Sequence, residues 1–168
     1  MALTTTQLQK RIKYWLWVLI IGLALSGITA FPIETELAWF SGHTGFMSAN
    51  AQNWFSAIYE AVKTTNANYP YLSYGTDWLA FAHLLLAALF IGPAKDPVNN
   101  IWVIQFGIIA CIAIFPLAFI AGSIRQIPFF WRLTDCSFGV IGIIPLLLAN
   151  SYTKQLIIFK NANQTTSR

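Results

Sequence analysis

The fold is decided by one stretch, residues 98–122, which reads VNNIWVIQFGIIACIAIFPLAFIAG and contains no Asp, Glu, Lys or Arg. A helix needs about 20 residues to cross a hydrocarbon core roughly 30 Å thick. An uncharged apolar run of this length therefore predicts a transmembrane helix.

Three further apolar runs lie at about residues 14–31, 77–92 and 129–149. Of all residues, 57% are apolar and 10% are charged, whereas a soluble domain carries roughly 25% charged residues. This composition excludes a soluble enzyme and a nucleic-acid-binding domain, and the length of 168 residues excludes a large transporter in a single chain. We predict an all-α, four-helix transmembrane bundle in which residues 1–168 form a single integral membrane domain.

The connections between the spans predict three further features. In the long loop 32–76, apolar residues from about 47 to 62 recur at helical spacing, opposite polar residues such as Asn53 and Glu60. We expect an outward-facing amphipathic helix there, which either lies in the headgroup region or caps the bundle. Asp96 and Pro97 predict the N-cap and first residue of the third span. Residues 150–168 are expected to form a cytoplasmic tail.

Charge is divided unevenly between the two sides that four spans define. The side of the termini carries Lys10, Arg11, Lys13, Lys95, Lys154, Lys160 and Arg168 against Asp96, which is seven positive charges and one negative, or +6. The other side carries Lys63, Arg125 and Arg132 against Glu34, Glu36, Glu60, Asp77 and Asp135, which is three positive and five negative, or −2. The positive-inside rule then places both termini in the cytoplasm, and we expect the inner membrane of a bacterium.

Two ionisable residues fall in or near the second span. The run from Trp78 to Gly92 is short, about 22 Å as a helix, so either the bilayer thins there or the helix begins nearer Tyr71. The earlier start would draw Asp77 below the outer boundary of the membrane, and in both cases His83 lies well inside it. Ionisable residues at such depth point to function. The alternative is structural: Asp77 favours the helix dipole, and His83 bonds to a neighbouring helix.

Arg125, Arg132 and Asp135 lie at the outward ends of the third and fourth spans. Arg132 and Asp135 are three residues apart and suit an ion pair on one helix face. These three residues, together with Asp77 and His83, form the outward polar pocket that we hypothesise. In it, Arg125, Arg132 and Asp135 are the ligand-binding residues, with the arginines holding an anionic group, while His83 and Asp77 are the catalytic candidates that move protons. The alternative is a network of structural ion pairs.

No cofactor and no metal site are predicted. Haem b usually needs two axial His; only His43 and His83 exist, and His43 lies in the loop. Haem bound through His83 would therefore need an unusual second ligand or one supplied by a partner. The element Ser41-Gly42-His43 occurs in lipid phosphatases, but the other two motifs of those enzymes are missing.

Several segments resemble uncharacterised small bacterial four-span integral membrane proteins. These segments are YGTDWLAFAH at 74–83, FIGP at 90–93, WRLTDCSFG at 131–139 and IPL at 144–146. The resemblance implies the four-span fold and transfers no activity.

Two functions are consistent with these features. The first is a protein whose outward pocket binds a lipid or a small amphipathic or anionic molecule, with the possibility that it is a small membrane enzyme. The alternative is a non-catalytic accessory subunit or assembly factor of a larger membrane complex. The expected partners are membrane lipids, with partner subunits or further copies of the chain as alternatives, and no nucleic acid.

Overall fold

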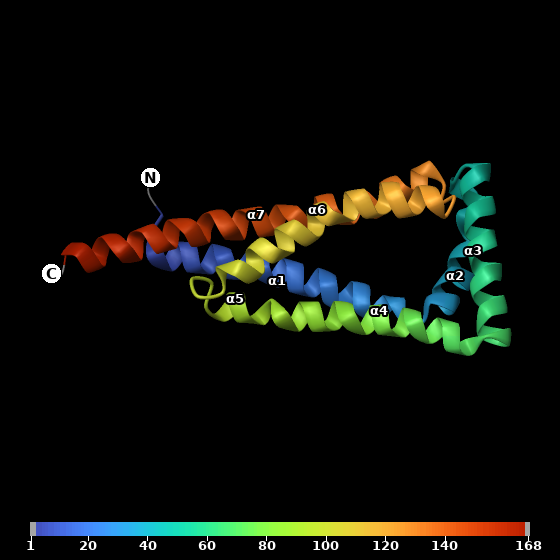
Figure 1. The fold of residues 1–168 in the computed structure, drawn as a ribbon, viewed down its shortest axis with the longest axis horizontal. Coiled ribbons are helices and arrows are strands. Elements are labelled where there is room, and N and C mark those ends of the chain that lie inside the picture. Colours follow the sequence, from blue (N-terminus) through green and yellow to red (C-terminus); the bar gives the residue numbers. More distant parts are fainter. Residues whose placement is uncertain (1–2, 167–168) are drawn as a thin grey trace. The chain divides into compact units, whose positions relative to one another are not determined.

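A computed structural model describes residues 3–166 of the chain, and side chains as far as residue 162. The helices are α1 (Thr5–Ala30), α2 (Ile33–Ser41), the short 3-10 helix η1 (Thr44–Phe46), α3 (Ala49–Asn68), α4 (Pro70–Leu89), α5 (Ile91–Lys95), α6 (Ile101–Ile124) and α7 (Phe129–Thr166) (Figure 1). No strand occurs within these residues, so the predicted all-α class is confirmed.

Four helical segments are long and apolar enough to cross a membrane. They are Thr5–Ala30, Pro70–Lys95, Ile101–Ile124 and Phe129–Ala162. Each overlaps one of the four apolar runs in the sequence. The second segment begins at Pro70. Of the two alternatives for the short second span, the structure therefore has the one in which the helix begins earlier, near Tyr71. Proline suits this position because backbone N–H groups in the first turn of a helix have no acceptor within the helix, so the N–H that proline lacks is not needed.

The chain divides into two compact units, which we describe separately. Unit 1 comprises Met1–Ile21 and Ala87–Arg168, and unit 2 comprises Gly22–Leu86. Helix α1 contributes its first part to unit 1 and its last part to unit 2.

Unit 1 is built on closely packed faces of α1, α6 and α7. Residues four apart on α1 are buried, namely Leu8, Ile12, Leu16 and Ile20. Helices α6 and α7 run side by side as a hairpin (Figure 1). A Cβ atom at Gly139 of α7 would lie 2.7 Å from the Cys111 carbonyl oxygen of α6. Glycine is therefore what lets the two backbones approach, as in other membrane helix pairs.

The predicted N-cap at Asp96 is wrong. Helix α6 begins at Ile101, five residues later, with Asn100 as its N-cap residue. The Asp96 carboxylate instead accepts hydrogen bonds from the backbone N–H of Asn99 at 3.3 Å and from its side-chain amide at 2.6 Å. These bonds stabilise a separate turn over residues 97–100, so the carboxylate is already occupied before the helix starts.

The segment expected as a tail is largely helical, because α7 continues to Thr166. Its buried face extends past the predicted end of the span at residue 149 through Thr153 and Leu156, which are 0% and 1% exposed. This packing stabilises the extra turns. Arg168, at the end of the expected tail, lies outside the described residues.

Unit 2 contains the end of α1, the pair α2–α3 and most of α4. The helix expected at about 47–62 is present as α3, and Ser48 caps it by accepting a bond from the Ala51 N–H. Helix α2 was not predicted. The rings of Phe40 in α2 and Phe55 in α3 lie 4.8 Å apart, so at least part of the apolar face of α3 packs against α2.

Three polar side chains tie the helices of unit 2 together. The amide of Asn66 in α3 donates to the Glu34 carboxylate of α2 at 2.5 Å, and the hydroxyl of Ser73 in α4 donates to the Asn66 side-chain oxygen. A Cβ atom at Gly27 of α1 would lie 2.8 Å from the Ala80 carbonyl oxygen of α4. The hydrogen bonds position the start of α4 within this unit, and the close approach at Gly27 positions its middle.

Candidate functional site: the turn between α6 and α7

The turn that joins α6 to α7 has a defined backbone geometry. Gln126 adopts a positive φ of 57°. Around it, the N–H of Ile127 donates to the Gly122 carbonyl at 2.8 Å, and the N–H of Gln126 donates to the Ser123 carbonyl at 3.1 Å. This pair of bonds is the Schellman motif, in which a left-handed residue ends a helix. Helix α6 therefore stops sharply, and α7 begins at Phe129.

Arg132 of α7 reaches back across this turn. Its Nε–H donates to the Ile127 carbonyl at 2.9 Å, and its Nη1 donates to the Ser123 hydroxyl at 2.7 Å. Its guanidinium also lies over the Phe129 ring, 5.9 Å from the ring centre, as in a cation–π contact. Two bonds in different directions hold the guanidinium in one orientation. We call this arrangement the Arg132 clamp.

Arg125 and Asp135 complete the residues predicted at this end of unit 1. Arg125 is the C-cap residue of α6 and is exposed, whereas Asp135 is half-buried one turn beyond Arg132. The expected ion pair between Arg132 and Asp135 is not formed among the described side chains. Arg132 bonds instead to Ile127 and Ser123, because the left-handed turn aims these acceptors at it.

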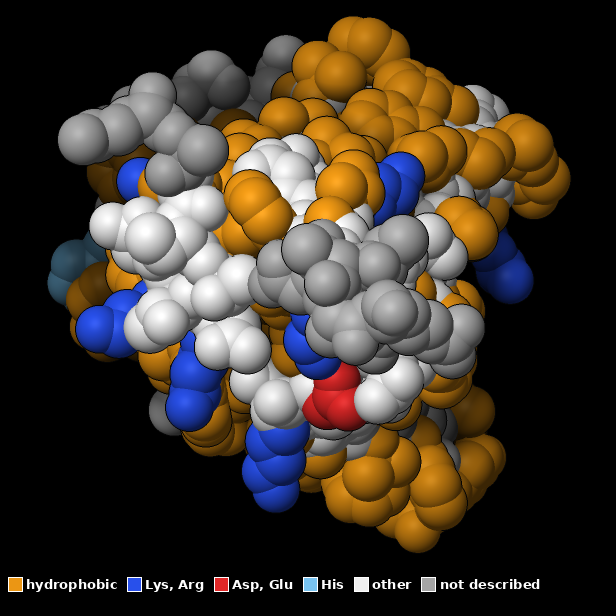
Figure 2. Space-filling view, turned by 90° about the vertical axis from the view of Figure 1, so that its left-hand side faces the viewer, with side chains coloured by type: hydrophobic (Ala, Val, Ile, Leu, Met, Phe, Trp, Pro, Cys, Tyr) orange, Lys and Arg blue, Asp and Glu red, His pale blue; other side chains and the backbone are white. Residues whose placement is uncertain are grey.

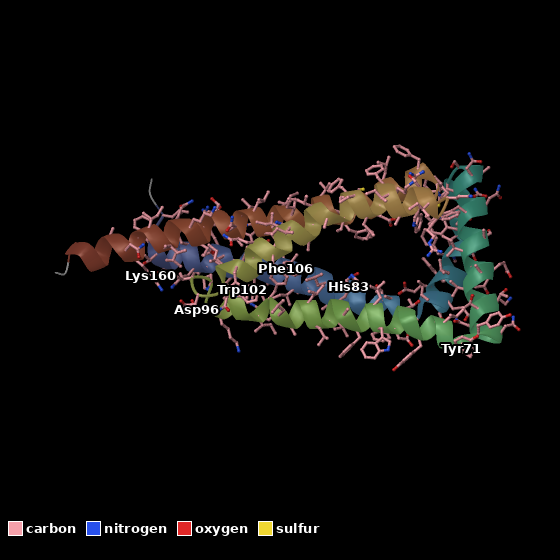
Figure 3. All side chains as sticks on the ribbon, viewed as in Figure 1. Tyr71, His83, Asp96, Trp102, Phe106 and Lys160 are labelled. Atoms are coloured by element: carbon pink, nitrogen blue, oxygen red, sulfur yellow. The ribbon has the colours of Figure 1, made fainter. Side chains whose placement is uncertain are left out.

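The other two predicted residues, Asp77 and His83, lie on α4 in unit 2. His83 is half-buried and lies along the middle of the segment Pro70–Lys95 (Figure 3). Its Nδ1 is 2.8 Å from the Leu79 carbonyl oxygen. A carbonyl can only accept, so Nδ1–H is the donor of this bond. The structural expectation for His83 was a bond to a neighbouring helix, whereas this bond is made within α4.

The structure thus brings Arg125 and Arg132 to one turn of unit 1, while Asp77 and His83 belong to unit 2. The pocket of five residues remains a prediction. Sequence reasoning missed the Arg132 clamp, because its acceptors depend on the left-handed conformation of Gln126. A left-handed residue at the end of a helix is usually Gly, and Gly in the sequence is the signal for it. Here the residue is Gln, so the sequence does not indicate the conformation.

A second arginine contact that sequence reasoning missed lies at the opposite end of unit 1. Nη1 of Arg11 in α1 donates to the Tyr152 hydroxyl of α7 at 3.2 Å, and the guanidinium lies 5.6 Å from the centre of the Tyr152 ring. This contact joins the start of α1 to the late part of α7.

No metal-binding group of three or more His, Cys, Asp or Glu side chains occurs among the residues that the structure describes. Cys111 and Cys136 are both free thiols. The haem alternative through His83 stays a prediction.

Comparison with protein-family models, with curated proteins and with solved structures finds no match for this chain. Two guanidinium groups within eight residues, one of them held in a fixed orientation, suit an anionic group such as a phosphate or a carboxylate.

Proposed function

We propose that this protein is an integral membrane protein that binds the anionic head group of a lipid or of a similar amphipathic molecule at the α6–α7 turn. Arg125 and Arg132 are the binding residues, and Asp135 is a polar neighbour that orients the ligand. Four apolar helices long enough to span a membrane support the membrane location.

The Arg132 clamp is the observation that carries this proposal. A guanidinium has five N–H donors. Two of them bond to Ile127 and Ser123, and the described side chains leave the other three available. Because the clamp fixes the plane of the group, little conformational entropy is lost when an anion binds. Arg125 is exposed on the same turn and adds a second positive charge.

The membrane environment adds weight to this assignment. An arginine close to the hydrocarbon region is costly unless it is paired or reaches the headgroup layer, where lipid phosphates are the abundant anions. The exposed apolar side chains Ile124 and Phe129 flank the turn and suit contact with acyl chains. An amphipathic anion can contact the arginines through its charged group and the apolar side chains through its acyl chain.

The topology that we propose places this turn on the outer side and both termini in the cytoplasm, in a bacterial inner membrane. It rests on the charge difference of +6 against −2 in the sequence.

The role of His83 and Asp77 in moving protons is a separate proposal with its own test. His83→Ala is expected to abolish turnover while leaving the folded yield unchanged.

The proposed binding is tested by native mass spectrometry of the protein extracted from its own membrane in a mild detergent. A specifically retained anionic amphiphile, lost in Arg125→Gln, would support it. Arg125 is the preferred position because it is exposed, so its removal is not expected to unfold the turn. Lys63→Gln, at an exposed lysine of α3, is the matched control for loss of one charge. A chain with no amphiphile and with stoichiometric partner subunits would favour the accessory-subunit alternative.

A further inference from the structure

The end of unit 1 opposite the α6–α7 turn is strongly basic. Helix α1 begins here, α7 ends here, and the turn between α5 and α6 lies here (Figure 1). Its exposed basic residues are Lys10, Arg11, Lys13, Lys95, Lys154 and Lys160. The acidic residue near them is Asp96, so the described residues of this end carry six positive charges against one negative. Figure 2 shows this face, with Lys and Arg side chains around it and acidic atoms at one place.

Two of these cations lie beside aromatic side chains of the kind that concentrate at the membrane–water interface. Lys13 directly precedes Tyr14 and Trp15, and Lys154 lies two residues after Tyr152. Tyr and Trp side chains concentrate at the membrane–water interface, where their rings sit at headgroup level. Because each of these lysines is within one helical turn of such a ring, their ammonium groups reach the phosphate layer when α1 and α7 span the membrane.

Arg11 is held in place at this end of unit 1 by Tyr152. Its bond to the Tyr152 hydroxyl and its position over the Tyr152 ring fix one edge of the guanidinium. The bond uses one of the five N–H donors of the group. The remaining donors form a fork that matches the oxygen atoms of a phosphate.

Exposed apolar side chains lie between two of the lysines of α7. Ile158 is 68% exposed and lies four residues after Lys154, so both occupy one face of the helix. Phe159 is also exposed and directly precedes Lys160. A lipid surface offers acyl chains to such side chains and phosphates to the lysines beside them, whereas a water-soluble polyanion offers only charge.

We propose that this end of unit 1 is a binding surface for anionic lipids, in which Arg11 is held by Tyr152 and contacts a lipid phosphate directly. The surface goes beyond the proposed site at Arg125 and Arg132, since it uses other residues of unit 1. It recruits anionic lipids to the annulus around the protein and does not depend on the single amphiphile proposed for the α6–α7 turn.

The test is the composition of lipid that co-purifies with the protein from mixed phosphatidylcholine–phosphatidylglycerol bilayers. We expect phosphatidylglycerol to be enriched over the bulk mixture. Each basic residue near an anionic surface contributes about fivefold at low salt, so Arg11→Gln and Lys154→Gln should each lower the enrichment by about that factor. Tyr152→Phe keeps the ring and removes the hydroxyl, so it should give a smaller loss than Arg11→Gln.

Three comparisons keep the result interpretable. Lys63→Gln should leave the enrichment unchanged. Arg125→Gln should remove at most the one amphiphile proposed for the α6–α7 turn, so it should not reproduce the losses of Arg11→Gln and Lys154→Gln. High salt should lower the enrichment of the wild-type protein, a measurement that needs no variant to fold. A wild-type lipid composition equal to that of the bulk, or an undiminished enrichment in both Arg11→Gln and Lys154→Gln, would overturn the proposal.

Discussion

The side chain of Arg132 lies directly against Gly122. A Cβ atom at Gly122 would lie 2.7 Å from Cδ of Arg132 and 2.9 Å from its Cγ. The guanidinium beyond these carbons is the part that bonds to Ile127 and Ser123. The missing side chain at Gly122 is therefore a structural requirement of the Arg132 clamp.

Gly122→Ala is expected to displace Arg132 and to break at least one of its two hydrogen bonds. Overpacking of this kind costs about 1–3 kcal/mol, and the better helix propensity of Ala returns up to about 1 kcal/mol. We expect a net loss of about 1–2 kcal/mol in the free energy of unfolding, measured by denaturation in detergent. Gly22→Ala is the control, because nothing lies within 4 Å of the Cβ added there. Equal stability changes in the two variants would argue against the contact.

Gln126→Gly is expected to stabilise the α6–α7 turn. The positive φ of 57° at this position strains a residue that has a Cβ atom, by about 1–2 kcal/mol, while Gly adopts it freely. Gly also increases the entropy of the unfolded chain, so the net gain should be about 0.5–1 kcal/mol. The midpoint of thermal unfolding should rise accordingly. Gln126→Ala should give no such gain, and a rise of the same size in both variants would contradict this account of the turn.

Two glycines of α7 should differ in their tolerance of a methyl group. Gly139→Ala brings Cβ to 2.7 Å from the Cys111 carbonyl oxygen, which is backbone and cannot move without shifting α6. Gly142→Ala brings Cβ to 3.2 Å from the Cys111 sulfur, which can yield by rotation of its side chain. We expect Gly139→Ala to lower the free energy of unfolding by about 1–3 kcal/mol more than Gly142→Ala. The reverse order would show that α6 and α7 do not pack in this register.

Asp96 should make stability depend on acid pH. The side-chain amide of Asn99 donates to the carboxylate and, with the Asn99 backbone N–H, lowers the pKa of Asp96 below its ordinary value of 3.8. Because the pKa is lower in the folded state, the stabilisation is present above pH 3.8 and is lost as the pH falls through the folded-state pKa. Lys160 lies at the same end of unit 1 and lowers the pKa further (Figure 3).

Asn99→Ala should therefore move the acid limb of the unfolding curve of the protein to higher pH. Asp96→Asn should remove the part of the pH dependence of stability that arises from protonation of Asp96. Thermal unfolding in detergent across the acid range measures both effects. If wild-type and Asn99→Ala proteins lose stability at the same pH, the bond between Asn99 and the carboxylate does not stabilise the turn.

Long-range hydrophobic patterning made the four spans predictable. The uncharged run at 98–122 and the basic residues before Tyr14 were sufficient for two of them. Boundaries were harder, because local interactions decide them. Asp96 has the composition of an N-cap, but Asn99 occupies its carboxylate. Helix α2 was missed although Glu34 and Glu36 lie in its first turn after Pro32, a usual signal of a helix start.

The candidate site was predictable in its residues but not in its contacts. Arginines at the outward ends of two spans were noticeable because they broke the charge rule. The partner of Arg132 was mistaken as Asp135, three residues away on the same helix. The observed partners depend on the backbone conformation of Gln126 and Ile127. The spacing of apolar residues in the sequence does not predict that conformation. The course of α7 past residue 149 was missed for a similar reason, because burial of Thr153 and Leu156 overrides the polar residues around them.

The proposed function requires the α6–α7 turn to bind an anionic amphiphile through Arg125 and Arg132. It is tested most directly by titrating the purified protein, in an uncharged detergent, with an anionic amphiphile that carries a fluorescent tail. We expect saturation at one molecule per chain, and an affinity at least tenfold lower in Arg125→Gln combined with Arg132→Lys, which removes one charge and the guanidinium fork. Lys63→Gln should bind as the wild-type protein does. Equal affinity in all three proteins, or a stoichiometry that never saturates, would contradict the claim.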